Sequence, residues 1–387
     1  MKNEHIIGID IGTYAIKIII TETDGKQESH ILHAIKSPSY GFRNGYIVDL
    51  EKAEESLALA LAKAEKEYKQ KITRAHFSIG GVGLTSQYVR TSLQITKKSN
   101  EINERNTEEL LQKAEDLFSA KYPNKKTLHI IPVKYKVDDR DVLGTPIGMY
   151  GNLIEVKVIF VTVLEHHYDA YINIIEKNNV HITDMIASPI ADSFSSTSYK
   201  QRSQGCILMN IGGETTSLST FENGILTSLD ILTIGSNDIT NDIALGLQIP
   251  LEIAEETKCS ENHDFSKKKV EEIIYARLTD IFELTQRHLQ KIKKNRLLPA
   301  GVILSGGGSQ IENISEYAKR QLMLPAQEVH LSLVSRKTKR NLRIPNSFST
   351  AYGLCSRDIE PKNYSKKFFS LKSWKKRIRY IIQEIMP

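Results

Sequence analysis

The chain has 387 residues, of which 40% are hydrophobic and 25% are charged, and this composition indicates a globular protein of two or more domains. No run of 18 apolar residues occurs, so we expect no transmembrane helix, and the N-terminal sequence predicts no signal peptide. The net charge is only +6 and the three cysteines lie far apart, which argues against a broad nucleic-acid-binding face and against a cysteine metal site.

The N-terminal third alternates between strand and helix patterns. Residues 5–36 alternate with β-branched side chains and predict strands, 49–70 predict a helix with an acidic start, and 74–81 predict a buried strand. Residues 84–163 then change to a strand, a helix with Asn103 as its cap, and two more strands. This β-α-β-β order indicates a small α+β insert.

The remaining chain repeats the first strand pattern. After a helix at 166–180, residues 207–235 predict consecutive hairpins with Asn223-Gly224 at one turn, and 236–298 are mostly helical. Residues 300–320 predict a buried strand, a glycine loop and a helix. A strand-turn-strand unit with a glycine turn therefore occurs twice, which is typical of a duplicated domain with a cleft between its halves.

Three glycine turns, each after an apolar strand, predict a nucleotide site. A glycine turn lets backbone N–H groups approach a phosphate without a clashing Cβ. "DIGT" (10–13) has such a turn with Lys17 behind it, "NIGGETT" (210–216) has a second, and "GGG" (306–308) suits close approach of an adenine or ribose. Each turn alone is weak, but three in this order point to one site in the cleft.

These segments resemble the FtsA family of cell-division proteins, within the actin/Hsp70/sugar-kinase ATPase superfamily. "GIDIGTYAIK" and "NIGGETTSL" resemble its two phosphate motifs, and "GVILSGGGSQIENI" resembles its adenosine motif. "ASPIADSFSS" and "FSTAYGL" resemble its two connecting helices. The most discriminating segment is "GTPIGMYGNLIEVKVIFVTV" (144–163), which resembles a subdomain that actin and Hsp70 lack.

The resemblance implies an α/β protein with an actin-like ATPase fold, ATP and Mg²⁺ as cofactors, Asp10 as the metal-binding residue, and at most weak ATPase activity. Glu255 and Lys258, in a segment of the form A-E-x-x-K, would lie by the sugar and base of the nucleotide. We assign no catalytic residue. The nucleotide-binding residues implied are Asp10, Gly12, Thr13, Lys17, Asn210, Gly212, Gly213, Thr215, Glu255, Lys258, Gly306, Gly307 and Gly308.

The second phosphate motif departs from the family pattern at three positions. The chain has Asn210 where the family usually has Asp, Glu214 where it has a third glycine, and Ser217 where it has a later Asp. An amide carries no charge to hold hydrated Mg²⁺, so we expect slow hydrolysis with binding largely retained, and we expect Asn210→Asp to raise the turnover rate. Glu214 would either repel the γ-phosphate or point to solvent.

The same resemblance divides the chain into five parts. Two duplicated lobes would enclose the nucleotide cleft. Lobe 1 would comprise 1–80, 164–190 and 348–360; the FtsA-type insert 81–163; the core of lobe 2 191–235 and 298–347; the helical subdomain of lobe 2 236–297; and a linker with an amphipathic helix 361–387.

The C-terminal segment predicts a membrane-surface helix. Residues 361–387 hold eight basic residues and one acidic residue, a net +7, so the rest of the chain is close to neutral at −1. Apolar side chains fall on one face and most basic ones on the other, as in an in-plane helix on anionic lipid. The residues expected at the membrane are Phe369, Leu371, Trp374, Lys375, Lys376, Ile378, Arg379, Ile381, Ile382 and Ile385. The alternative is a terminal helix packed on the core.

The resemblance also implies partners and a location. The C-terminal peptide of FtsZ would bind the helical subdomain near Arg277, with Arg287 and Lys291 as further cations, although ordinary solvated charges explain them equally well. Subunits would self-associate into filaments on the inner face of the cell membrane at the division septum, tethering FtsZ there. Nucleic acid is not an expected partner. Alternatives are a PilM-like scaffold for type IV pilus assembly and an active sugar kinase or phosphatase of the same superfamily.

Overall fold

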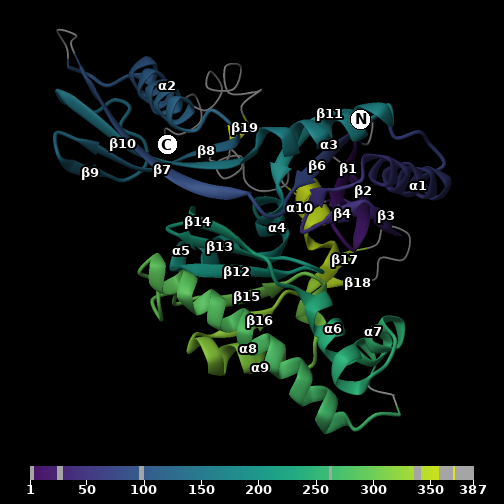
Figure 1. Cartoon of the computed structure of the whole chain (residues 1–387). Helices are drawn as coiled ribbons and strands as arrows, with labels where there is room; N and C mark the ends of the chain where they lie inside the picture. Colours follow the sequence, from purple (N-terminus) through teal and green to yellow (C-terminus); the bar gives the residue numbers. More distant parts are fainter. Residues whose placement is uncertain are drawn as a thin grey trace.

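The computed structural model describes residues 4–23, 29–95, 100–260, 264–334, 341–356 and 369–370. Within these ranges the chain forms two lobes, each built on a five-stranded sheet, and a smaller subdomain that projects from the first lobe (Figure 1). The mixed α/β architecture is the predicted fold class.

The sheet of lobe 1 has the strand order β11-β6-β1-β2-β3. Strands β1 to β3 form an antiparallel meander, while β6 runs parallel to β1, and β11 to β6. Helices pack on the sheet, and the central strand β2 is buried along almost its whole length. The elements are β1 (Glu4–Ile11), β2 (Ala15–Thr23), β3 (Ser29–Pro38), β4 (Phe42–Arg43), β5 (Tyr46–Ile47), α1 (Leu50–Tyr68), β6 (Arg74–Ile79), α3 (Glu165–Lys177) and β11 (His181–Ala187).

The sheet of lobe 2 repeats this arrangement strand for strand, in the order β14-β13-β12-β15-β16. Here β12 to β14 form the antiparallel meander, and β15 and β16 add in parallel. The strands are β12 (Cys206–Ile211), β13 (Thr216–Glu222), β14 (Ile225–Leu232), β15 (Gly301–Ser305) and β16 (Ala326–Glu328). The shared topology agrees with the strand-turn-strand repeat in the sequence.

Side chains alternate between two cores across the lobe 2 sheet. Ile207, Met209 and Ile211 of β12 face helices α8 and α9, whereas Cys206 and Leu208 face the hinge between the lobes. The other elements of this half are α5 (Tyr199–Gln204), α6 (Ser236–Leu247), α7 (Leu251–Cys259), α8 (Lys267–Lys291), η1 (Gly307–Gln310), α9 (Ile314–Leu322), β17 (Leu331–Val334), β18 (Asn341–Ile344) and η2 (Asn346–Phe348).

The inserted subdomain lies between β6 and β11 of lobe 1. Helix α2 (Glu104–Lys121) begins in a capping box with Asn103, as expected, and covers one face of a sheet ordered β19-β8-β10-β7. The edge strand β7 meets the edge of lobe 2, where the Ser86 hydroxyl donates to the Leu229 carbonyl and accepts from its N–H. The strands are β7 (Thr85–Gln94), β8 (Lys125–Val137), β9 (Arg140–Val142), β10 (Leu153–Leu164) and β19 (Phe369–Ser370).

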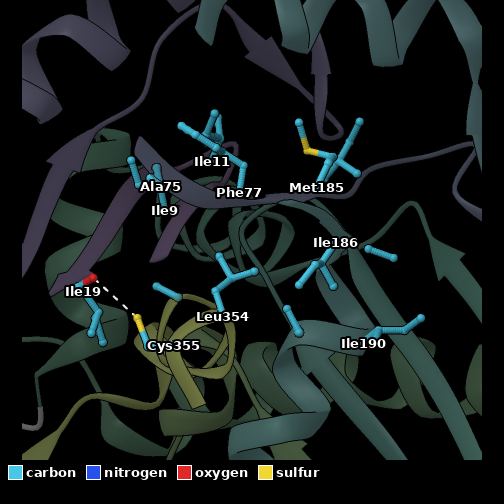
Figure 2. Packing of buried hydrophobic residues seen from close by; sticks show 14 of the residues in the cluster. Ile9, Ile11, Ile19, Ala75, Phe77, Met185, Ile186, Ile190, Leu354 and Cys355 are labelled. Atoms are coloured by element: carbon cyan, nitrogen blue, oxygen red, sulfur yellow. Dashed lines mark hydrogen bonds between the residues drawn. The ribbon is translucent and has the colours of Figure 1, made fainter. Parts of the chain in front are cut away.

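Two connecting helices, α4 (Ser188–Ser196) and α10 (Ser349–Ser356), cross at the junction of the lobes. They pack beneath the lobe 1 sheet, where Ile190 and Leu354 join its apolar core and the Cys355 thiol donates to the Ile19 carbonyl at 3.6 Å (Figure 2). A Cβ on Gly353 would lie 1.8 Å from the Ala191 carbonyl oxygen. Only glycine allows this approach, so the crossing of the two helices depends on it.

Gly353→Ala should therefore destabilise the junction strongly. Overpacking a rigid backbone contact costs about 3 kcal/mol or more, so we expect the midpoint of thermal unfolding to fall by several degrees. Gly246→Ala is the matched control, because it is also a helical glycine and its added Cβ meets only the flexible end of Ile273. Equal melting of the two variants would contradict the account of the crossing.

Candidate nucleotide-binding cleft

A cavity of about 670 Å³ opens between the two lobes, within the size range of small-molecule sites. Its walls bring together ten of the thirteen residues predicted for nucleotide binding. These are Asp10, Lys17, Asn210, Gly212, Gly213, Glu255, Lys258, Gly306, Gly307 and Gly308. Gly12, Thr13 and Thr215 are not among the lining residues and belong to the turns themselves.

The two phosphate turns have the same internal geometry. The N–H of Gly12 donates to the Ala15 carbonyl at 3.3 Å, and the N–H of Gly212 donates to the Thr215 carbonyl at 2.9 Å. Each turn joins two antiparallel strands, β1 to β2 and β12 to β13. The sequence therefore builds one loop design twice, once on each side of the cleft.

Asp10 and Lys17 form the charged pair of the first turn. They face each other across β1 and β2, and the Lys17 ammonium donates to one Asp10 oxygen at 3.1 Å. The Ser78 hydroxyl donates to the other oxygen at 2.7 Å. Asp10 is only 7% exposed, and these two bonds replace the water that its carboxyl group loses on burial. This places one oriented carboxylate and one cation at the wall of the cleft.

Asn210 forms a hydrogen bond with Asp192, a residue that no sequence motif indicated as part of the site. Its side-chain amide donates to Asp192 at 2.8 Å, and Asp192 lies on connecting helix α4. Asp192 is fully buried, and burial raises the pKa of its carboxyl group, although hydrogen bonds from serine hydroxyls and from Asn210 oppose that rise. The local sequence does not distinguish Asp192 from a residue on the surface of a helix, because its partner Asn210 lies on a strand, β12.

Glu214 is bonded to lobe 1 and does not simply point to solvent, while repulsion of a γ-phosphate stays a prediction. Its carboxylate accepts a hydrogen bond from the backbone N–H of Asn44 at 2.5 Å and so links the second turn to lobe 1. Nearby, the Gly45 N–H donates to the Thr13 hydroxyl at 3.0 Å. The first and second turns are thus tied to the same loop between β4 and β5.

The opposite end of the cleft has a buried network around Lys258. Its ammonium, with a side chain only 6% exposed, donates to Glu255 at 2.6 Å, to the Thr240 hydroxyl at 2.7 Å and to the Ser236 carbonyl at 3.1 Å. Burial raises the pKa of Glu255, but hydrogen bonds from Lys258 and Thr240 outweigh it and leave the pKa below its usual value. The Glu255 carboxylate is therefore charged at neutral pH.

The third glycine run follows buried strand β15 and needs glycine for steric reasons. Gly306 has a φ of +83°, and a Cβ there would lie 2.4 Å from the Asn210 side-chain oxygen. A Cβ on Gly308 would meet Ile211 at 2.4 Å. The backbone of this run therefore lies directly against the second phosphate turn, as close approach to a ligand requires.

Several lining residues were missed from the sequence. Lys36 lies opposite Lys17 on the neighbouring strand, and its ammonium sits 5.2 Å from the centre of the Tyr14 ring. Ser236 and Asn237, at the N-terminus of α6, donate their N–H groups to the Gly212 and Gly213 carbonyls at 2.8 and 2.7 Å. Cross-strand register places Lys36 in the cleft, and it could have been found by pairing β2 with β3.

Arg277 is already engaged within the chain. Its guanidinium forms a fork with Asp242 of α6 at 2.6 and 2.9 Å and a third contact with Asp280 at 3.1 Å. These bonds raise the pKa of Arg277 above its usual range, and Arg287 pairs with Glu283 at 3.6 Å. An acidic ligand would have to compete with these carboxylates, so the role of Arg277 in partner binding stays a prediction.

The membrane-binding segment falls mostly outside the described residues. Of the positions predicted to contact lipid, only Phe369 lies within them, in the two-residue strand β19 that pairs with Ile130 and His129 of β8. Across the described ranges, no helix is both long enough and apolar enough to span a bilayer. The same ranges contain no cluster of three or more metal-ligating His, Cys, Asp or Glu side chains.

Known structures with a similar fold include a pilus-assembly complex and a bacterial MreB protein. The chain is similar in structure to the PilM–PilN type IV pilus biogenesis complex, with a TM-score of 0.67, 16% identity and coverage of 92% of this chain and 99% of the other. It is also similar to MreB 5 of Spiroplasma citri bound to AMPPNP, with a TM-score of 0.54, 12% identity and coverage of 98% and 99%. The chain therefore has an actin-like ATPase fold.

Family models and curated relatives give a narrower similarity. Residues 207–353 match the model described as cell division protein FtsA, and residues 81–162 match the SHS2 domain inserted in FtsA. FtsA of Pseudomonas aeruginosa is 25% identical over 345 residues, covering 83% of this chain and 82% of the relative. For FtsA of Borreliella burgdorferi the identity is 24%, with coverage of 95% and 94%. The chain is therefore similar to FtsA, a cell division protein, over most of its length.

The side chains present fit a nucleotide with its metal. Lys17 and the close backbone of the two glycine turns suit phosphate oxygens. The oriented carboxyl group of Asp10 suits hydrated Mg²⁺, which needs few protein ligands when phosphates supply others. The sugar and base would meet the Glu255–Lys258 end of the cleft and the third glycine run.

The bridge from Glu214 should slow the release of nucleotide. Glu214→Ala removes the carboxylate that accepts from the Asn44 N–H, so we expect release of a fluorescent ATP analogue to become roughly tenfold faster in stopped-flow measurements. Asn44→Gly is the control, because the bond uses the backbone N–H and glycine keeps the φ of +51° accessible. An unchanged release rate in Glu214→Ala would contradict the bridge.

Proposed function

We propose that the protein binds ATP with Mg²⁺ in the cleft, self-associates on the inner face of the cytoplasmic membrane at the septum, and tethers FtsZ there. The observation that carries the proposal is the convergence of two repeated phosphate turns and a glycine run on one cavity. Similarity to FtsA supports the cell-division role.

Each residue has a distinct task in nucleotide binding. Lys17 neutralises phosphate charge while its bond to Asp10 orients that carboxylate toward the metal. Bound Mg²⁺ would neutralise charge on the phosphate oxygens. Gly213 would present its backbone N–H group from the opposite lobe, while the Gly212 N–H closes the turn on Thr215, so a triphosphate would hold the lobes together. The ligand acts as a clamp on the conformation of the whole chain.

Hydrolysis should be slow, because Asn210 is neutral where the related motif carries an acid. Charge stabilisation at the transferred phosphoryl group is a large term in phosphoryl transfer, and a neutral amide supplies little of it. We therefore infer at most a weak ATPase. This also disfavours an active sugar kinase or phosphatase, which would need a catalytic carboxylate at this turn.

Membrane attachment and partner binding complete the proposal. The basic, amphipathic pattern of residues 371–387 supports reversible attachment to anionic lipid, and the helical subdomain around α6 and α8 would receive the FtsZ peptide. Head-to-tail stacking of copies would give filaments. A PilM-like scaffold role is favoured less, because the similarity to PilM concerns the fold alone.

Lys17→Ala should weaken ATP binding. Removal of a cation from the phosphate site should raise the dissociation constant by roughly tenfold or more, measured by calorimetric titration of the full chain with ATP and Mg²⁺. Lys66→Ala, an exposed lysine on α1, is the control and should bind as the parent does. If both variants bind ATP like the parent protein, the proposed phosphate site is wrong.

Loss of the apolar face of the C-terminal helix should abolish membrane binding. Trp374→Glu with Ile378→Glu leaves Phe369 and Ser370 in their pairing with β8, so the folded body should be unaffected. The parent should sediment with vesicles that contain anionic lipid, less so at high salt, and the double variant should stay in the supernatant. Co-sedimentation of the double variant, or equal pelleting of residues 1–367, would refute the anchor.

A further inference from the structure

Asp192 is a fully buried carboxylate at the junction of the lobes, and the proposed function does not yet use it. It lies on α4, and its three side-chain donors come from α4 itself and from two adjacent strands of lobe 2. Ser196 donates at 2.6 Å, Ser305 at 2.5 Å and Asn210 at 2.8 Å. All three donors are neutral, and burial raises the pKa of the Asp192 carboxyl group. A buried carboxyl group is costly without hydrogen bonds, and here three bonds hold it in one position.

The carboxylate fixes the orientation of the Asn210 amide. The nitrogen of the Asn210 amide donates to Asp192, so the carbonyl oxygen of that amide faces away from Asp192. That oxygen lies against Gly306, where a Cβ would meet it at 2.4 Å, and Asn210 lines the cleft. Asn210 therefore presents an acceptor toward the ligand while Asp192 holds its donor.

The second phosphate turn has an amide where the first turn has an acid. Asn210 precedes Gly212 as Asp10 precedes Gly12, and the carboxyl group of Asp192 lies in direct hydrogen-bond contact behind that amide. Burial of Asp192 in α4 keeps that acid one layer below the cleft surface. The two residues together still hold one carboxylate and one amide.

We propose that Asp192 is a positioning residue of the nucleotide site and forms one unit with Asn210. The unit requires one acid and one amide, and either position can hold the acid. Asp192 orients the Asn210 oxygen toward the cleft and places a carboxyl group directly behind the second phosphate turn. The ligand assignment rests on the proposed ATP binding, whereas the pairing of the two side chains does not.

Because Asn210 contacts Asp192, the substitution Asn210→Asp should affect the stability of the protein as well as its activity. Asn210→Asp alone would place two carboxyl groups in contact inside the protein, without a donor between them, so it should destabilise the junction. Asp192→Asn alone would replace one of the two oxygens that accept from the three donors by an NH₂ group. The exchange Asp192→Asn/Asn210→Asp restores one acid and one amide and should recover most of the lost stability.

Four full-length proteins test the pairing without nucleotide: the parent, the two single variants and the exchange. We expect each single variant to unfold roughly 5–10 °C below the parent, and the exchange to unfold clearly above both single variants. Asn223→Asp at an exposed hairpin turn adds the same charge and should melt like the parent. If Asn210→Asp melts like the parent, or if the losses simply add in the exchange, the unit is refuted.

Magnesium dependence tests the role at the ligand site. ATP binding is titrated with and without Mg²⁺, and the ratio of the two affinities is compared. The exchange puts the charge at the cleft surface, so we expect this ratio to rise by roughly tenfold over that of the parent. An unchanged ratio in a stable exchange variant would refute the positioning role. Absence of ATP binding by the parent would instead refute the proposed function, and the melting comparison would still stand.

Discussion

The two phosphate turns approach each other closely across the cleft. A Cβ on Gly213 of the second turn would lie 3.1 Å from the Cβ of Tyr14, which follows the first turn, and within lobe 2 a Cβ on Gly235 would lie 2.4 Å from the Gly213 carbonyl oxygen. This approach lets equivalent loops from two duplicated sheets share one cavity, and it brings the N-terminus of α6 against the second turn. The position of the cleft, the reach of Glu214 to Asn44 and the crossing of the hinge helices all depend on the lobes being this close.

Two ion pairs contribute charge to the wall of the cleft. Asp10 is paired with Lys17 across β1 and β2, and Glu255 with Lys258 along α7. Asp192 differs, because its donors are neutral and it ties α4 to the sheet of lobe 2. A ligand that binds at the second turn would therefore act on the hinge directly, through a single hydrogen bond. This links nucleotide occupancy to the relative position of the lobes, as a conformational clamp requires.

Local pattern was enough to predict the strands, the turns and most of the cleft. Alternation defined β1, β2 and β12, and the capping of α2 by Asn103 followed from residue type. Contacts between distant segments were not readable in the same way. Glu214 and Asn44 are 170 positions apart, and Asp192 and Asn210 belong to different elements, so neither bond has a local signature. Arg277 looked like a free cation because its partner Asp242 lies on another helix.

Amide hydrogen exchange of the full chain, with and without ATP and Mg²⁺, tests the central claim that one nucleotide is held by both lobes. Backbone N–H groups of both turns should gain protection together, over residues 10–15 and 210–216, because the same phosphates bind them. Protection should also appear at the third glycine run, 306–308. Protection confined to one lobe, or its absence from both turns at saturating nucleotide, would contradict the shared cleft.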